Sequence, residues 1–430
     1  MATTFYATLS AAAPLASSTD TNQPAQFNQA FTSPLIDRAC DWQTAIIRFT
    51  AQGMDLPLHI VPIDPAQAPD GTDPTTIKTL YQVRVGYMTR TGVGGTAGTY
   101  QAGTAVDVMW RPQLYGTGAS GNVVSPPVTA MGADDYRTWV WTYDALLTCI
   151  NKAIQTAYAA AVLAGFGGAV ANAQGPVFTA YSTSPASFQC TMPLGFTPGR
   201  GSTLTTASSA TAVEMFLWLS PSLAPLLEGF PVRARSSDGW ICIAPEYAAI
   251  MGGAATGVNA QYPANTDLPP IPATSSAGLV NSVAWANPAI AASGIEARFV
   301  MKQATGSGDN WCPISEVAFF STMPIIPEST APPTILTTGK TGTGSASSSY
   351  TSIISDLDLP LALGATDWRS KVTYAPDAQY RWLDFGTTAA SIQNISWLML
   401  WRERLTGVLR PVLIRPGGSV QMKLVFRRKY

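Results

Sequence analysis

Short apolar runs separated by turn residues make up most of the chain. The runs are rich in Val, Ile, Thr and aromatic residues, which favour extended strands, and Gly, Pro, Ser, Thr, Asn and Asp separate them. This pattern predicts an all-β sandwich with long loops between its strands. The clearest predicted strands cover residues 44–50, 78–88, 105–111, 139–142, 212–219, 240–244, 297–303, 317–321 and 391–401.

The last apolar run alternates between apolar and polar positions, with Val425 as the one exception. From Val420 to Phe426 every second residue is apolar, and the residues between them include Lys423 and are followed by Arg427. Successive side chains of a strand point to opposite faces, so the apolar residues share one face and the two cations share the other. The pattern predicts a strand with one buried face.

One segment has helical spacing. Between Tyr143 and Leu163 apolar residues recur three or four positions apart, which places them on one side of a helix. Thr142 is suited to cap its start, and Gly165 follows its end. We therefore expect one amphipathic helix near 143–163, which packs through an apolar stripe of Leu146, Ile150, Ile154 and Ala157.

The helix belongs to a long uncharged stretch, because no charged residue lies between Lys152 and Arg200. A membrane-spanning helix needs roughly 20 strongly apolar residues. Its most apolar part, residues 157–173, relies on Ala instead and contains Gly165, Gly167 and Gly168 near its middle. The composition favours a buried helix and loop, and we expect no membrane span.

The length of the chain allows more than one domain, because 430 residues exceed the roughly 100 to 200 of a typical domain. Two stretches rich in Pro, Gly, Ser and Thr, at 263–278 and 324–350, interrupt the strand pattern. They suggest an N-terminal β-rich region at 1–262 that includes the helix, a loop-rich region with intervening strands at 263–350, and C-terminal strands at 351–430 that complete the sandwich.

Charged side chains are scarce and unevenly distributed. They make up 12% of the residues and give a formal net charge of −1, which provides no overall field for binding nucleic acid or an anionic membrane. Residues 402–430 nevertheless carry a net charge of +7, and residues 1–401 carry −8. The cations at the tip of this segment are Lys423, Arg427, Arg428 and Lys429.

These terminal cations have three possible roles: contact with an acidic neighbouring subunit, weak contact with a packaged genome, or solvation of an otherwise apolar strand. No basic residue precedes Arg38, so the chain lacks a basic N-terminal arm of the kind that neutralises a genome. This absence favours the subunit contact over the genome contact.

The sequence gives no basis for catalytic, metal or cofactor chemistry. His59 is the single histidine and lies in an apolar run, and the five cysteines are scattered without a CxxC pair. Residues 116–121 match GxGxxG, but they lead into Ser-Pro-Pro at 125–127, where no helix can present its N-terminus to a pyrophosphate. We expect no catalytic residues, no cofactor and no metal ion, and we expect buried, reduced cysteines.

A series of short motifs near the end of the chain carries a family resemblance. D-x-x-Y-R-x-L-D at 377–384 is followed by an apolar strand ending at Trp401, R-L-T-G at 404–407, P-G-G-S at 416–419 and K-L-x-F-R-R-K at 423–429. This order resembles the end of β-rich capsid proteins of small icosahedral viruses, the minor capsid or penton-like group. Residues 48–49 before 56–57, and residues 151–153 in the predicted helix, are similar to the same group. The resemblance implies a jelly-roll shell subunit, with one jelly roll or two, located in the virion. The N-terminal region at 1–262 is then expected to be a jelly-roll region.

The aromatic content is consistent with that role, since 12 Trp, 15 Tyr and 15 Phe combined with few charges suit large obligate interfaces. We therefore predict a structural capsid subunit that assembles with copies of itself, with other capsid subunits, or with both, into the shell or its vertices. The alternative is a β-sandwich binding module, such as an adhesin or a carbohydrate-binding protein, whose exposed Trp and Tyr stack on sugars. That alternative predicts a soluble monomer with a ligand groove.

Overall fold

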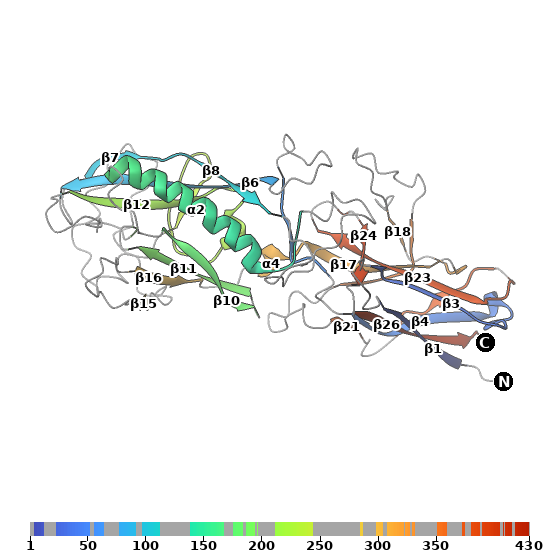
Figure 1. Ribbon diagram of the computed structural model, residues 1–430. Helices are drawn as coiled ribbons and strands as arrows, with labels where there is room; N and C mark the ends of the chain where they lie inside the picture. Colours follow the sequence, from blue (N-terminus) through green and yellow to red (C-terminus); the bar gives the residue numbers. More distant parts are fainter. Residues whose placement is uncertain are drawn as a thin grey trace, which may run out of the picture.

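The computed structural model describes residues 4–12, 23–51, 56–63, 77–91, 97–111, 138–166, 175–183, 186–193, 196, 211–243, 284–286, 298–303, 308–321, 323–326, 329–331, 351–358, 372–374, 380–387, 389–404, 407, 409–414 and 418–429. These residues form two β-rich parts that lie end to end (Figure 1). The strands nearest the two termini lie together in one of these parts.

Strands from both ends of the chain form a jelly roll of two sheets. One sheet has the order β1 (Thr4–Ala12), β26 (Ser419–Arg428), β4 (Trp42–Ala51) and β21 (Val372–Tyr374), and β22 (Leu383–Asp384) also pairs with β4. The other has the order β20 (Ser355–Asp358), β17 (Ile314–Ser321), β23 (Asn394–Glu403) and β24 (Leu409–Pro411), and β3 (Gln26–Ala30) also pairs with β23.

The strand order identifies the topology. If β21 and β22 are taken as one interrupted strand and β24 as an addition, the eight strands numbered along the chain lie as 1-8-3-6 and 5-4-7-2. First pairs with last and second with seventh, as in the doubly folded Greek key of a jelly roll. The described strands therefore form one jelly roll. This confirms the predicted fold class, which allowed one jelly roll or two.

The two sheets enclose the first hydrophobic core. Phe49 on β4 meets Phe319 on β17 with ring centroids 5.4 Å apart, and Phe319 in turn meets Trp397 on β23. All three rings are fully buried. The alternation predicted for the last strand is confirmed, because its apolar residues Val420, Met422, Leu424 and Phe426 all point into this core with no exposed surface.

A second core is formed by residues between Leu58 and Trp311. One of its sheets has the order β13 (Val232–Arg235), β14 (Ile241–Ile243), β12 (Thr211–Leu219), β6 (Ile77–Thr91) and β7 (Ala97–Gln101), and β8 (Val106–Trp110) also pairs with β6. The other has the order β10 (Val177–Thr183), β11 (Ala186–Pro193), β16 (Arg298–Lys302) and β15 (Ala284–Ala286).

Short elements complete the described structure. They are the strand pairs β2 (Gln23–Pro24) with β25 (Leu413–Ile414), β18 (Ser329–Ala331) with β19 (Thr351–Ile353) and β5 (His59–Ile60) with β9 (Trp139–Val140), the helical turns η1 (Ala39–Asp41) and η5 (Ala224–Leu227), and the four-residue helix α4 (Gly308–Trp311).

The long helix α2 (Tyr143–Phe166) confirms the helix predicted at 143–163 and extends three residues further. It packs against β6, β8 and β10 in the second core. Asn151 fixes it to β10, because its amide nitrogen donates to the carbonyl of Phe178 and its amide oxygen accepts from the Phe178 N–H, both at 2.8 Å.

The jelly roll takes its described strands from residues 4–51 and 314–428, so the second core is inserted between β4 and β17. Helix α2 belongs to this inserted part. The predicted boundaries after residues 262 and 350 lie outside the described residues, and the division of the chain at those points stays a prediction.

Candidate assembly surface and the junction of the two cores

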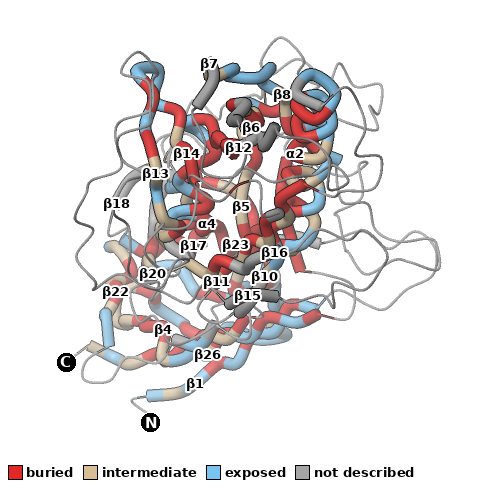
Figure 2. The backbone as a smooth tube through the Cα atoms, turned by 90° about the vertical axis from the view of Figure 1, so that its left-hand side faces the viewer, coloured by how far each residue is buried: buried red, intermediate tan, exposed pale blue. Residues whose placement is uncertain are grey.

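The cationic end of β26 lies between two strands. The full length of β1 pairs with β26 on one side, and β4 pairs with it on the other. Figure 2 colours these strands by burial: buried and exposed residues alternate along β1 and along the first half of β26, and residues 424–426 of β26 are all buried.

Lys423 lies on the outward side of the sheet. Its ammonium group is 4.9 Å from the centre of the Tyr6 ring on β1, within range of a cation–π interaction. Its neighbour in register on β4 is the exposed Arg48. Two like charges opposite each other in a sheet repel. The pair of Lys423 and Arg48 therefore does not stabilise an isolated subunit.

Arg427 is held by stacking and by one hydrogen bond. Its guanidinium lies 3.7 Å from the centre of the Trp382 ring, and its Nε donates to the amide oxygen of Gln43 at 3.0 Å. The guanidinium is planar and weakly hydrated, which suits it to lie on an aromatic face.

The two cations that follow are paired with carboxylates from distant segments. Arg428 Nη2 lies 3.7 Å from Asp41 Oδ2, and Lys429 Nζ lies 2.9 Å from Asp384 Oδ1. Asp384 also accepts from the Gln43 amide at 2.7 Å. The hydrogen bonds from Lys429 and Gln43 hold the pKa of Asp384 below its ordinary value.

Two further arginines of the basic segment are paired more deeply. Arg402 Nε donates to Glu316 at 2.6 Å across β23 and β17, and Arg410 donates to the buried Glu403 at 2.9 and 3.1 Å. Three acids from outside the segment, Asp41, Glu316 and Asp384, therefore offset part of the +7 charge of residues 402–430, in which Glu403 is already counted. The sequence analysis did not identify these acidic partners, because no local pattern around Asp41, Glu316 or Asp384 predicts that they pair with the basic segment.

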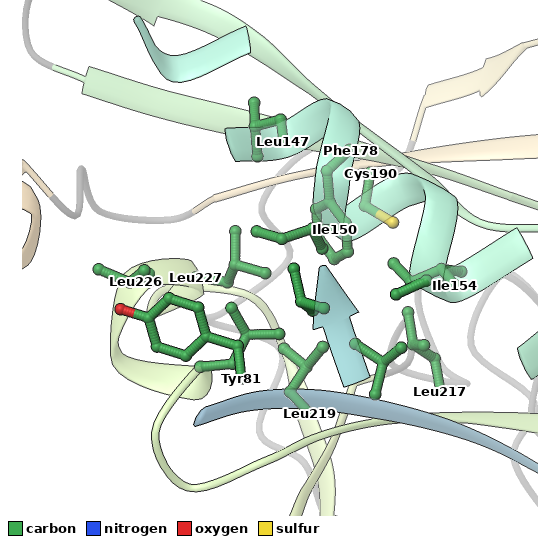
Figure 3. Close-up of a cluster of buried hydrophobic side chains, with 14 of the residues drawn as sticks. Tyr81, Leu147, Ile150, Ile154, Phe178, Cys190, Leu217, Leu219, Leu226 and Leu227 are labelled. Carbon is green, nitrogen blue, oxygen red and sulfur yellow. The ribbon is translucent and has the colours of Figure 1, made fainter. Parts of the chain in front are cut away.

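The predicted packing stripe of the helix lies in the second core. Leu146, Ile150 and Ile154 have no exposed surface, and Ala157 is 3% exposed. In Figure 3 Ile150 and Ile154 point toward Leu217 and Leu219 of β12, with Phe178 and Cys190 close by. By length and composition alone, residues Tyr143–Ala164 could also span a membrane, and half of their most apolar window is buried inside the protein.

His59 lies where the chain passes between the two cores. Leu56 packs in the first core and Leu58 in the second, and the chain returns between Trp311 in the second core and Cys312 in the first. His59 Nε2 is 2.6 Å from the Tyr81 hydroxyl oxygen, and its ring lies 5.7 Å from the ring of Trp311. Burial lowers the pKa of His59 to about 4, against a smaller opposing effect of a hydrogen bond with the Trp311 backbone.

The cysteines and other potential metal ligands form no site among the described residues. All five cysteines are free thiols, three buried and two partly buried, and burial raises the pKa of Cys149 and of Cys190. Among the residues that the structure describes, no group of three His, Cys, Asp or Glu side chains could hold a metal ion.

The comparisons with known proteins agree with this architecture. A chain from the 3.5 Å cryo-EM structure of the Sputnik virophage is similar with a TM-score of 0.62 and 17% identity over 100% of both chains. The crystal structure of the selenomethionine-labelled mavirus penton protein is similar with a TM-score of 0.50 and 11% identity over 99% of both chains. At these identities the two structures establish the fold.

A match to a protein-family model that spans nearly the whole chain identifies the family. No curated protein sequence matches the chain. The family model described as Sputnik minor capsid protein V18/19 matches residues 6–428. The chain therefore belongs to the Sputnik minor capsid protein V18/19 family and is a structural capsid subunit of a virion.

Proposed function

We propose that this subunit forms closed, rotationally symmetric capsomers at the vertices of an icosahedral shell. The observation that carries the proposal is the single jelly roll in a chain that belongs, over nearly its whole length, to a minor capsid family. The shared fold with a penton protein supports the vertex position. Closed symmetry would cover aromatic surface that an isolated subunit leaves exposed, such as Tyr6 and Tyr380.

Sedimentation velocity and negative-stain microscopy of the purified chain test this proposal. We expect rings of identical copies whose contacts bury more than about 2,000 Å², the area at which obligate interfaces begin. A monodisperse monomer at micromolar concentration, at neutral and at mildly acidic pH, would refute the capsomer. It would favour the alternative of a monomeric binding module.

We further propose that Arg427, Arg428 and Lys429 act in the protein shell rather than on the genome. Within the subunit Arg428 pairs with Asp41, Lys429 pairs with Asp384 and Arg427 stacks on Trp382, which makes these cations less available to phosphates. A genome contact would instead need several unpaired cations and would weaken steeply with salt.

Replacing the three cations together by Gln is expected to slow assembly roughly three- to tenfold, since charges at the rim of an interface act mainly on the rate of encounter. The nucleic acid content of the particles should not change. Light scattering gives the assembly rate, and the absorbance ratio of purified particles gives the nucleic acid content. Lys152→Gln with Arg235→Gln, two exposed cations elsewhere, is the control. Normal assembly into particles poor in nucleic acid would contradict the proposal.

A further inference from the structure

The outer edge of β1 is an open sheet edge. The strand order of its sheet ends at β1, so within the described residues only one of its two sides is paired. β1 also lies at the margin of the molecule in both views (Figures 1 and 2). Its pairing with β26 runs through all nine residues, from Thr4 to Ala12, without a shift in register. The open side therefore presents a long, straight row of backbone N–H and C=O groups.

This edge lacks the devices that usually prevent strand pairing, namely charges, proline and bulges. β1 contains no charged residue and no proline, and its register is unbroken. Several other described edge strands do carry such devices: β13 has two arginines and a bulge, β10 has a bulge, and β20 has two aspartates. The edge strands β3, β15 and β21 lack them as well, but they have only three to five residues. β1 is the longest described edge strand without such a device, which suits it to accept a partner strand.

The edge is also fixed in position. Ala7, Leu9 and Ala11 point into the jelly-roll core, and the Phe5 ring stacks on Phe426 with centroids 4.8 Å apart. The outward side chains are uncharged and exposed, and Tyr6 has 60% of its surface exposed. A rigid edge loses little conformational freedom when a strand is added to it, so its main-chain hydrogen bonds contribute more fully to affinity.

The order of the sheet points to a second copy of this chain as the occupant. The opposite end of the order β1-β26-β4-β21 is a second edge, formed by β21. The backbone at β22 is already paired on that side, since the Ile326 N–H donates to the carbonyl of Asp384 at 2.7 Å and the Gly386 N–H donates to that of Pro324 at 2.9 Å. A contact that joins one end of a sheet to the other end of the same sheet in the next copy is head to tail. Repeated head-to-tail contacts close into a ring when the rotation between copies allows it.

We propose that the open edge of β1 adds a strand of a second copy of this chain, at its β21 edge, when capsomers form. The inference rests on the closed capsomer proposed above. It concerns backbone hydrogen bonds, so it is distinct from the side-chain contacts of the basic terminus.

Hydrogen exchange measured by mass spectrometry tests this pairing on the full-length chain. In an edge strand of an antiparallel sheet, alternate N–H groups point away from the sheet and exchange readily. Between the free subunit and the capsomer, we expect the outward amides of residues 4–12 to slow by about tenfold or more.

A matched pair of variants separates the edge from the charge of the sheet surface. Ser10 and Gln421 face each other in register, are both exposed, and differ in that Ser10 lies on the edge strand. Ser10→Lys should lower the fraction of subunits assembled by about tenfold, because a lysine on an edge strand disfavours pairing with another strand. Gln421→Lys should change this fraction less than about twofold. Circular dichroism verifies that both variants fold.

The outcomes distinguish this inference from the proposed function. Capsomers in which residues 4–12 exchange as fast as in the free subunit would overturn the edge pairing and leave the capsomer intact. Equal loss of assembly in the two lysine variants would also overturn it, because the effect would then come from charge on the surface. A wild-type chain that never oligomerises would overturn both.

Discussion

Ile150→Asp is expected to abolish folding of the inserted part, and with it capsomer formation. Ile150 has no exposed surface and lies among apolar side chains of the second core. A carboxylate there is either ionised without a partner or protonated and poorly hydrogen bonded. Either state costs several kcal/mol, which is a large part of the roughly 5–15 kcal/mol by which a domain is stable.

Thr148→Asp provides the control, because Thr148 is exposed on the same helix. It adds the same charge at little cost, and its free energy of unfolding should stay within about 0.5 kcal/mol of the wild type. Denaturant unfolding followed by circular dichroism gives the two free energies. Equal unfolding midpoints for both variants would show that the stripe of α2 is not packed as described.

Lowering the pH from 6.5 to 4 is expected to reduce the free energy of unfolding through His59 by about 3 kcal/mol. The unfolded chain binds a proton at the ordinary pKa of 6.5, whereas the folded chain does so only at about 4. Between these values the unfolded state holds more protons, so stability falls as the pH falls. The loss is complete below pH 4.

His59→Gln isolates this contribution, because an amide can hydrogen bond to the Tyr81 hydroxyl but does not titrate. Urea unfolding at a series of pH values should show a shallower dependence for the variant between pH 6.5 and 4. The carboxylates that titrate in this range are common to both chains and cancel in the difference. Parallel curves for the two proteins would contradict the buried, neutral state of His59.

Features with a local period were predictable from the sequence. The alternation in β26 and the helical spacing in α2 are set by neighbouring residues, and both elements lie where they were expected. The all-β class followed in the same way from strand composition. These signals depend only on which face of an element is buried.

Features that join distant segments were not predictable. The Thr44 hydroxyl donates to the carbonyl of Val425, 381 positions away, and no periodicity reveals that β4 lies beside β26. For the same reason the insertion between β4 and β17 was not expected. The terminal cations were identified from the sequence, but their partners Asp41 and Asp384 are brought to them by the closed sheet.

The position of the inserted part has a consequence for biosynthesis. β1, β3 and β4 leave the ribosome early, yet β26, which lies between β1 and β4, is the last described strand to be made. At about 5–20 residues per second the early strands wait on the order of 20–80 s for it. The second core can condense meanwhile, since its residues are complete once Trp311 is made.

Its condensation brings His59 and Trp311 together, which shortens the loop that the jelly roll must close. The insertion can therefore serve the nascent subunit as an internal folding template. Until translation ends, neither side of its β1 strand is paired. The risk of aggregation is greatest during this period.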